Sequence, residues 1–141
     1  MTTLARNPYP YVLEWDSLPE LAYLASPYSH IDPEIRHFRY QYTVVAVAHL
    51  LHEGIFVYSP ILHNHPVACF NGSGRGMGFW MPFDFAILGR CSKLVVLTLD
   101  GWADSEGVTI ERHRALKLGI PIEYMTPVPI PDEFTDFQVR E

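Results

Sequence analysis

Leu94-Val95-Val96-Leu97-Thr98-Leu99 is followed, after four intervening residues, by Asp104-Ser105-Glu106-Gly107-Val108-Thr109-Ile110-Glu111. These two stretches carry the pattern from which the topology follows. The pattern predicts a buried strand, a polar loop and the start of a helix that carries a carboxylate. A Gly in the first helical turn lets a ligand approach the backbone, and the free N–H groups there suit an anion or a sugar hydroxyl. Open α/β sheets bind their ligands at such places.

Strands and helices alternate on both sides of this pattern. We predict strands at 21–26, 55–58, 93–99 and 121–125, and helices at 33–53, 79–91 and 108–118. The helix signals are Asp32 before Pro33 at the first start and Gly119 at the last end. Residues 59–78, rich in Pro, Asn and Gly, are predicted to form a long loop. The order predicts an α/β fold, a small flavodoxin-like or Rossmann-like three-layer sandwich with a mainly parallel sheet of four or five strands.

The length of 141 residues and the apolar content of 48% predict a single globular domain. We assign 1–20 to a Pro-containing N-terminal arm, 21–125 to the domain and 126–141 to a Pro-rich acidic tail. Both ends are candidates for a subunit interface. Because neither a secretory signal nor a membrane-spanning run is evident, we expect a cytoplasmic protein with no membrane partner.

The net charge of −6 argues against a nucleic acid polymer as partner, since that binding depends on clustered Lys and Arg. Cys69 and Cys91 have neither metal-site nor disulfide-scaffold spacing and are interpreted as free thiols. His63 and His65 lack a third ligand in register, so we expect no metal there.

Three motifs lie at the predicted strand and helix ends, and they carry a family resemblance. They are Tyr23-Leu24-Ala25-Ser26-Pro27-Tyr28, then Phe83-Asp84, then Gly101-Trp102-Ala103-Asp104-Ser105-Glu106-Gly107 with Glu111. In this order they resemble the nucleoside 2-deoxyribosyltransferase superfamily. The His65-Pro66 pair is similar to one in an uncharacterised bacterial and phage branch of it. The resemblance covers about residues 21–125.

The resemblance implies catalytic roles for three residues. Glu111 falls on the nucleophile that attacks the anomeric carbon, Asp84 on the acid that handles a proton or holds a sugar hydroxyl, and Tyr23 on the donor that orients the nucleophile. A carboxylate suits this work because a covalent intermediate divides one hard displacement into two easier ones. The alternatives stay open: Glu111 as a solvated charge, Asp84 as a helix cap and Tyr23 as a core aromatic.

Ser105 is a departure from the transferases, which have a sugar-binding Asp six positions before the nucleophile. A Ser there is similar to the branch that hydrolyses deoxynucleoside 5′-monophosphates, where it helps to bind phosphate. Asp104 takes the transferase role if the loop differs by one residue. Otherwise Ser105 is only an N-cap and Gly107 a flexible link.

Other candidate substrate-binding residues surround these positions. Ser26 and Ser29 follow the first strand, and Trp102 either packs or stacks beside the sugar. The proposed base-stacking wall consists of His65, Phe70, Trp80 and Phe83, although such an aromatic set is more often part of a core. The Gly-rich segment 72–76 is interpreted as a lid from which Arg75 reaches a phosphate.

Two classes of function follow. The first is an enzyme that cleaves the N-glycosidic bond of a (deoxy)nucleoside or nucleoside 5′-monophosphate, by hydrolysis or by transfer to another base. The second is a nucleotide-binding sensor that keeps the pocket without turnover. The chemistry uses carboxylates with water or an acceptor base, so we expect no cofactor. The resemblance also implies a homodimer or a higher homo-oligomer.

Overall fold

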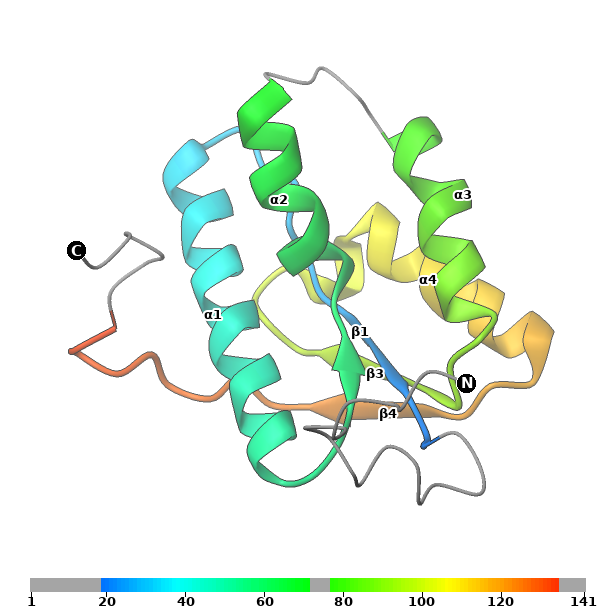
Figure 1. Cartoon of the computed structure of the whole chain (residues 1–141). Coiled ribbons are helices and arrows are strands. Elements are labelled where there is room, and N and C mark those ends of the chain that lie inside the picture. The colour runs from blue at the N-terminus through cyan, green and yellow to red at the C-terminus, as the bar shows by residue number, and fades with distance from the viewer. Residues whose placement is uncertain (1–18, 72–76, 135–141) are drawn as a thin grey trace, which may run out of the picture.

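The computed structural model describes residues 19–71 and 77–134, and in this part of the chain it has four parallel strands and four α-helices (Figure 1). The strands are β1 (Ala22–Ala25), β2 (Val57–Tyr58), β3 (Lys93–Leu97) and β4 (Ile122–Met125). The helices are α1 (Pro33–His52), α2 (Pro60–Asn71), α3 (Met77–Leu88) and α4 (Glu106–Leu118), with a short 3₁₀ helix η2 (Trp102–Asp104) before α4.

The sheet order is β2-β1-β3-β4, and every neighbouring pair is parallel. From β1 the chain runs to β2 on one side of it and then crosses to β3 on the other side, so the direction of winding reverses between β1 and β3. This reversal is the topological switch point of the flavodoxin-like order, outside whose carboxyl ends ligands bind.

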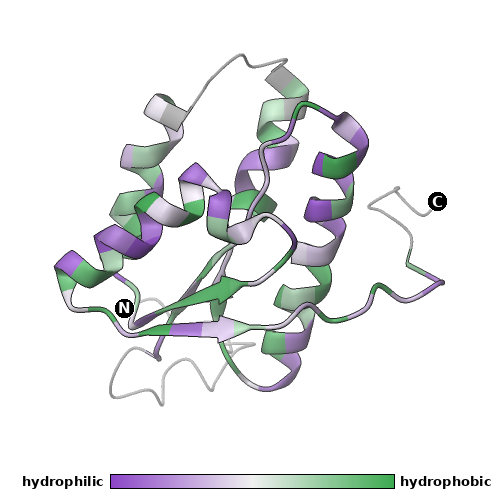
Figure 2. Cartoon of the chain, turned by 180° about the vertical axis from the view of Figure 1, so that it is seen from behind, coloured by the Kyte–Doolittle hydropathy of each residue, from purple (hydrophilic) through white to green (hydrophobic). Residues whose placement is uncertain are grey.

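Alternation along the central strands supplies a core on each side of the sheet. Tyr23, Ala25, Leu94 and Val96 pack with Leu88 of α3 and with Val108 and Ala115 of α4. Ala22, Leu24, Val95 and Leu97 pack with Ala46 and Leu50 of α1. Figure 2 shows β3 as hydrophobic over most of its length, since only Lys93 at its start is polar, and the edge strand β4 as mixed. The expected three-layer Rossmann-like α/β sandwich is confirmed.

The helix boundaries follow from local chemistry. Asp32 caps α1 by accepting a hydrogen bond from the Glu34 backbone N–H, with Pro33 at the first helical position. Ser105 caps α4 in the same way, accepting from the Val108 N–H at 3.3 Å. Gly119 ends α4 with a φ of 72°, a conformation that favours glycine. The predicted start of this helix at Val108 was two residues late.

The predicted loop at 59–78 is wrong for 60–71, which form α2, and for 77–78, which begin α3. Ser59 caps this helix, because its Oγ accepts from the Leu62 N–H at 3.3 Å, and Pro60 follows as the first helical residue. Pro66 stands inside the helix, where it removes one backbone hydrogen bond. Contacts of α2 with α1 and α3 hold the helix despite this loss.

The ends of the chain are described in part. Residues 126–134 continue from β4 without helix or strand, while the predicted arm at 1–18 and the last residues of the predicted tail, 135–141, lie outside the described residues. Within the described ranges, no helix combines the length and apolar character needed to cross a membrane.

Candidate active site

Glu111 lies on the face of α4 that packs against the sheet. Val108, Glu111 and Ala115 are spaced by three and four residues, so they share one buried stripe of the helix. Glu111 is 4% exposed, and its carboxyl group accepts a hydrogen bond from the hydroxyl of Tyr23 on β1. The pair that the resemblance implied is therefore brought together, and Glu111 is not the solvated charge of the alternative.

Asp84 reaches the same region from α3. It lies one turn before Leu88 on the buried face of that helix and is 5% exposed. Its Oδ1 accepts a hydrogen bond from Asn64 Nδ2 of α2 at 3.2 Å. The Asn64 Oδ1 in turn accepts from His63 Nδ1 at 2.7 Å, because a carbonyl oxygen can only accept. Asp84 lies inside α3, so it is not the N-cap of the alternative.

Burial dominates the electrostatics of these groups. Desolvation raises the pKa of Glu111 to about 8; the hydrogen bond from Tyr23 lowers it and the nearby charge of Asp84 raises it. Desolvation also raises the pKa of Asp84 to about 6, against the lowering effects of Asn64 and His63. The pKa of Tyr23 is raised by burial and by the charges of Glu111 and Asp84, so its hydroxyl remains a donor.

The loop after β1 is tied to α1. Ser26 is buried, and its Oγ lies 3.2 Å from Thr43 Oγ1, which itself donates to the Arg39 carbonyl at 2.7 Å. The hydroxyl hydrogen of Ser26 therefore points to Thr43. Ser29 is exposed, and its carbonyl accepts from Arg39 Nη1 at 2.9 Å. Ser29 is available to a ligand, whereas Ser26 offers an acceptor only in this arrangement.

The loop after β3 approaches the same edge of the sheet. Arg39 Nη2 donates to the Asp100 carbonyl at 3.3 Å, so one guanidinium links this loop to the loop after β1. Gly101 has a φ of 89°, a conformation that favours glycine, and a Cβ there would lie 2.7 Å from that nitrogen and displace the guanidinium.

Trp102 and the residues after it differ in whether their side chains are free to contact a ligand. Trp102 packs: its ring lies 5.6 Å from that of Tyr124 and 5.4 Å from the Arg112 guanidinium. This favours packing over stacking beside a sugar. Asp104 is exposed, and Ser105 is the N-cap of α4. A Cβ at Gly107 would meet Ser105 Oγ alone, at 4.0 Å, so the first turn of α4 leaves room for a ligand.

The predicted base-stacking wall divides between two sides of α2. His65 stacks on Tyr40 of α1, with ring centroids 4.4 Å apart, and hydrogen-bonds the Tyr28 hydroxyl. Phe83 instead stacks on His63 at 5.1 Å, and Trp80 meets Phe83 edge-on. Phe70 is 91% exposed. A single wall formed by all four residues is therefore wrong. The predicted lid at 72–76, with Arg75, lies outside the described residues.

Sequence reasoning missed three residues that the structure places beside the carboxyl groups or the loops. Asn64 donates a hydrogen bond to Asp84, and Thr43 is hydrogen-bonded to Ser26. The ring of Tyr58 on β2 lies 5.9 Å from that of Tyr23. The available signal for Tyr58 was its position at the end of a predicted strand. Asn64 gave none, because its segment was assigned to a loop.

Two surface hollows lie elsewhere. One of about 430 Å³ is lined by Pro33, Glu34, His37 and Phe38 at the start of α1, and one of about 320 Å³ lies at the amino ends of β1 and β3. Neither adjoins Glu111, so a ligand must displace covering side chains to reach it. Residues 19–71 and 77–134 contain no group of three or more His, Cys, Asp or Glu placed to hold a metal.

A protein-family model described as a domain of unknown function, DUF1937, matches residues 20–126. None of the curated proteins matches the chain.

Proposed function

This chain belongs to the DUF1937 family, a domain of unknown function, and we propose from its site that it cleaves the N-glycosidic bond of a (deoxy)nucleoside or nucleoside 5′-monophosphate. The observation that carries the proposal is the buried hydrogen bond from Tyr23 to Glu111, with Asp84 close enough to raise the pKa of both. Perturbed carboxyl groups of this kind concentrate at functional sites.

The chemistry proceeds in two displacements. A Glu111 carboxylate oxygen attacks C1′ of the sugar, the bond from C1′ to the base nitrogen breaks, and its electron pair leaves with the base. Protonated Asp84 gives its proton to that base. The glycosyl ester on Glu111 is then attacked at C1′ by water, whose proton passes to Asp84, or by a second base. The ester bond breaks and Glu111 regains its charge.

A purely structural role for the pair accounts poorly for its position. A carboxyl group on the core-facing stripe of α4 loses hydration, and an apolar side chain of similar size would fill the space between Val108 and Ala115 without that loss. The sheet order supports a site here independently, since β1 and β3 flank the switch point. The homo-oligomer implied by the resemblance stays a prediction.

The proposal is tested by incubating the full chain with deoxynucleosides and their 5′-monophosphates, with and without a second base, and measuring free base by chromatography. Release without an added base identifies a hydrolase, and release that requires one identifies a transferase. Tight binding of a nucleotide without any release contradicts the enzyme and favours a sensor.

Substituting the nucleophile is the sharper test. We expect Glu111→Gln to lower kcat/KM at least about 10³-fold, because an amide cannot form the glycosyl ester. Glu53→Gln is the matched control, since Glu53 is the exposed C-cap of α1, where the chain turns toward the start of β2. Equal loss in both variants, or none in Glu111→Gln, contradicts the nucleophile assignment.

A further inference from the structure

Tyr58 places a buried hydroxyl beside the candidate site without a partner. It is the last residue of β2 and pairs in register with Tyr23 of β1. Of the buried side-chain polar atoms in the described residues, three have no hydrogen-bond partner: the Tyr58 hydroxyl, Arg112 Nε and Arg114 Nε. Leaving such a group unpaired destabilises the fold, whereas Phe would fill the same volume without this cost.

The surroundings of Tyr58 belong to the proposed site. Its ring lies 5.9 Å from that of Tyr23 and 6.3 Å from that of His63. Burial and the charge of Asp84 raise the pKa of the hydroxyl to about 12, so it keeps its proton at neutral pH and acts as a donor. Asp84 Oδ1 accepts from Asn64, and no hydrogen bond joins Asp84 to Tyr58 in the described structure.

We propose that Tyr58 donates a hydrogen bond to the departing nucleobase, at a keto oxygen or ring nitrogen on the edge that faces β2. This inference rests on the proposed function, and it assigns a base-recognition residue to that site. A base gains negative charge as its bond to C1′ breaks, so an acceptor on it becomes stronger in the transition state. Tyr58 then contributes to kcat as well as to binding.

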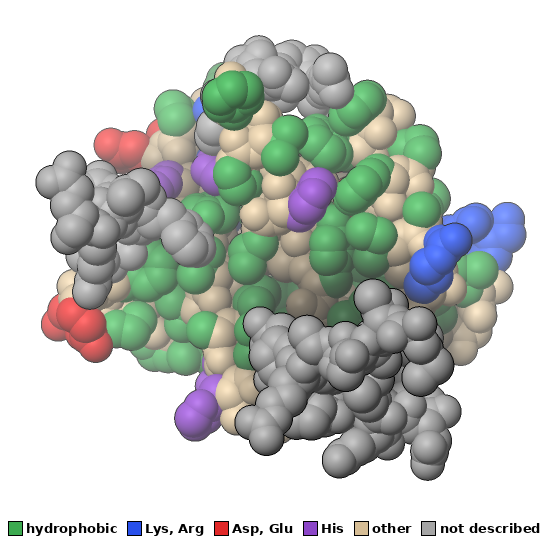
Figure 3. All heavy atoms as spheres, viewed as in Figure 1, with side chains coloured by type: hydrophobic (Ala, Val, Ile, Leu, Met, Phe, Trp, Pro, Cys, Tyr) green, Lys and Arg blue, Asp and Glu red, His purple; other side chains and the backbone are tan. Residues whose placement is uncertain are grey.

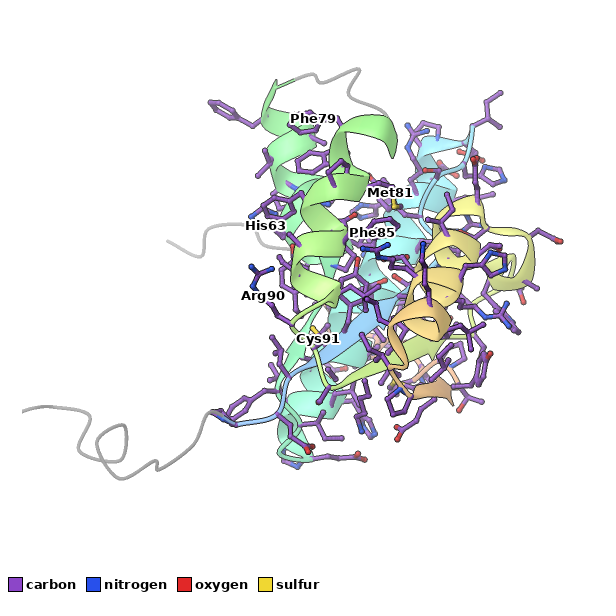
Figure 4. The ribbon with its side chains drawn as sticks, turned by 90° about the vertical axis from the view of Figure 1, so that its right-hand side faces the viewer. His63, Phe79, Met81, Phe85, Arg90 and Cys91 are labelled. Carbon is purple, nitrogen blue, oxygen red and sulfur yellow. The ribbon has the colours of Figure 1, made fainter. Side chains whose placement is uncertain are left out.

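Aromatic side chains around Tyr58 complete the recognition site. His63 is exposed and stacks on Phe83, which is 41% exposed, with 17° between the ring planes. Figure 4 places His63 on the side of α3 away from Met81 and Phe85, and Figure 3 shows hydrophobic side chains gathered over α2 and α3 around a His. A base that takes the place of His63 can stack on the face of Phe83.

The test compares Tyr58→Phe with the wild-type full chain. We expect kcat/KM for base release to fall about tenfold, the loss of one hydrogen bond, with kcat reduced as well as KM raised. The affinity for the free product base, uracil, hypoxanthine or adenine, falls by a similar factor in calorimetry. The melting temperature stays equal or rises, because the removed hydroxyl had no partner in the ligand-free fold. Tyr124→Phe is the control, since Tyr124 is half exposed on the far edge strand β4.

Each outcome decides a separate point. Unchanged kcat/KM in Tyr58→Phe, with base release by the wild type, overturns the inference and leaves the proposed function intact. A lower melting temperature with unchanged affinity also overturns it, because the hydroxyl then has a structural partner. If base binding depends on Tyr58 but no base is released, the proposed cleavage is contradicted and the role of Tyr58 in base recognition stands. If the wild type neither releases nor binds any base, both proposals fail.

Discussion

At the scale of single residues, the two carboxyl groups of the site differ in acidity in an unexpected direction. The pKa of Asp84, the proposed acid, is raised to about 6, and that of Glu111, the proposed nucleophile, to about 8. Catalysis requires the acid protonated and the nucleophile ionised. Because the pKa of Asp84 lies below that of Glu111, a site with one proton carries it mainly on Glu111, and the productive form with the proton on Asp84 is the minority.

The pH profile of kcat/KM should therefore be bell-shaped, with limbs near 6 and 8 that belong to the coupled pair. Below the first limb both groups are protonated, and above the second both are ionised. In Asp84→Asn we expect the alkaline limb to disappear, because no acid remains to lose its proton. Activity should then rise with pH to a plateau about 10² to 10⁴-fold below the wild-type maximum. Measured initial rates from pH 5 to 9.5 check this.

Asn64→Ala is the useful companion variant for that measurement. It removes the hydrogen bond that lowers the pKa of Asp84, so this pKa should rise while the bell shape remains. A wild-type profile with a single limb, or an unaltered bell in Asp84→Asn, contradicts the assignment of Asp84 as the acid.

How far single residues could be predicted from sequence depended on their local signals. Tyr23, Glu111 and Asp84 were named from motifs. The structure brings them together because they lie on β1, α4 and α3, respectively, at one face of the sheet. The division of His65 from Phe83 could not be foreseen, since it follows from the rotation of consecutive residues around α2. Within a predicted loop no such rotation is defined.

At the scale of elements, the caps explain both the success and the failure of prediction. The pair Asp32-Pro33 predicts a helix start, and α1 begins there. The equivalent Ser59-Pro60 falls at the start of the predicted loop 59–78, although it starts α2 by the same chemistry. Pro66 and the Gly-rich residues after it hide the helix from prediction, because Pro and Gly have low helix propensity. The helix forms nonetheless, because contacts with α1 and α3 stabilise it.

Pro66 should accordingly limit the stability of α2. Replacing it by Ala restores a backbone donor inside the helix, and we expect the free energy of unfolding to rise by about 1–2 kcal/mol after the greater entropy of the unfolded chain is allowed for. Pro60→Ala is the matched control at the first helical position, where the missing N–H has no cost, and it should give no gain. Urea unfolding of both variants provides the comparison. A loss of stability in Pro66→Ala would mean that the proline ring packs better than Ala.

At the scale of the whole molecule, the site depends on elements distant in the sequence. Residues 23, 84 and 111 come from three elements, and the parallel order β2-β1-β3-β4 brings them together beside the switch point. Alternation and cap signals were sufficient to predict this architecture. They were not sufficient to predict how α2 covers the carboxyl edge of the sheet, because that placement depends on contacts with α1 and with Phe83 and Asp84 of α3.

The raised pKa of Glu111 also makes the stability of the whole fold depend on pH. Its ordinary value is 4.5, so between about 4.5 and 8 the unfolded chain releases a proton that the folded chain keeps. The stabilisation is complete below 4.5 and is lost as the pH rises through 8. The free energy of unfolding of the wild type, relative to Glu111→Gln, should fall by a few kcal/mol over this window. Urea titrations of both proteins at several pH values measure the difference. Glu133→Gln, a change at an exposed residue outside the helices and strands, should run parallel to the wild type. Parallel curves for Glu111→Gln would mean that Glu111 titrates alike in both states.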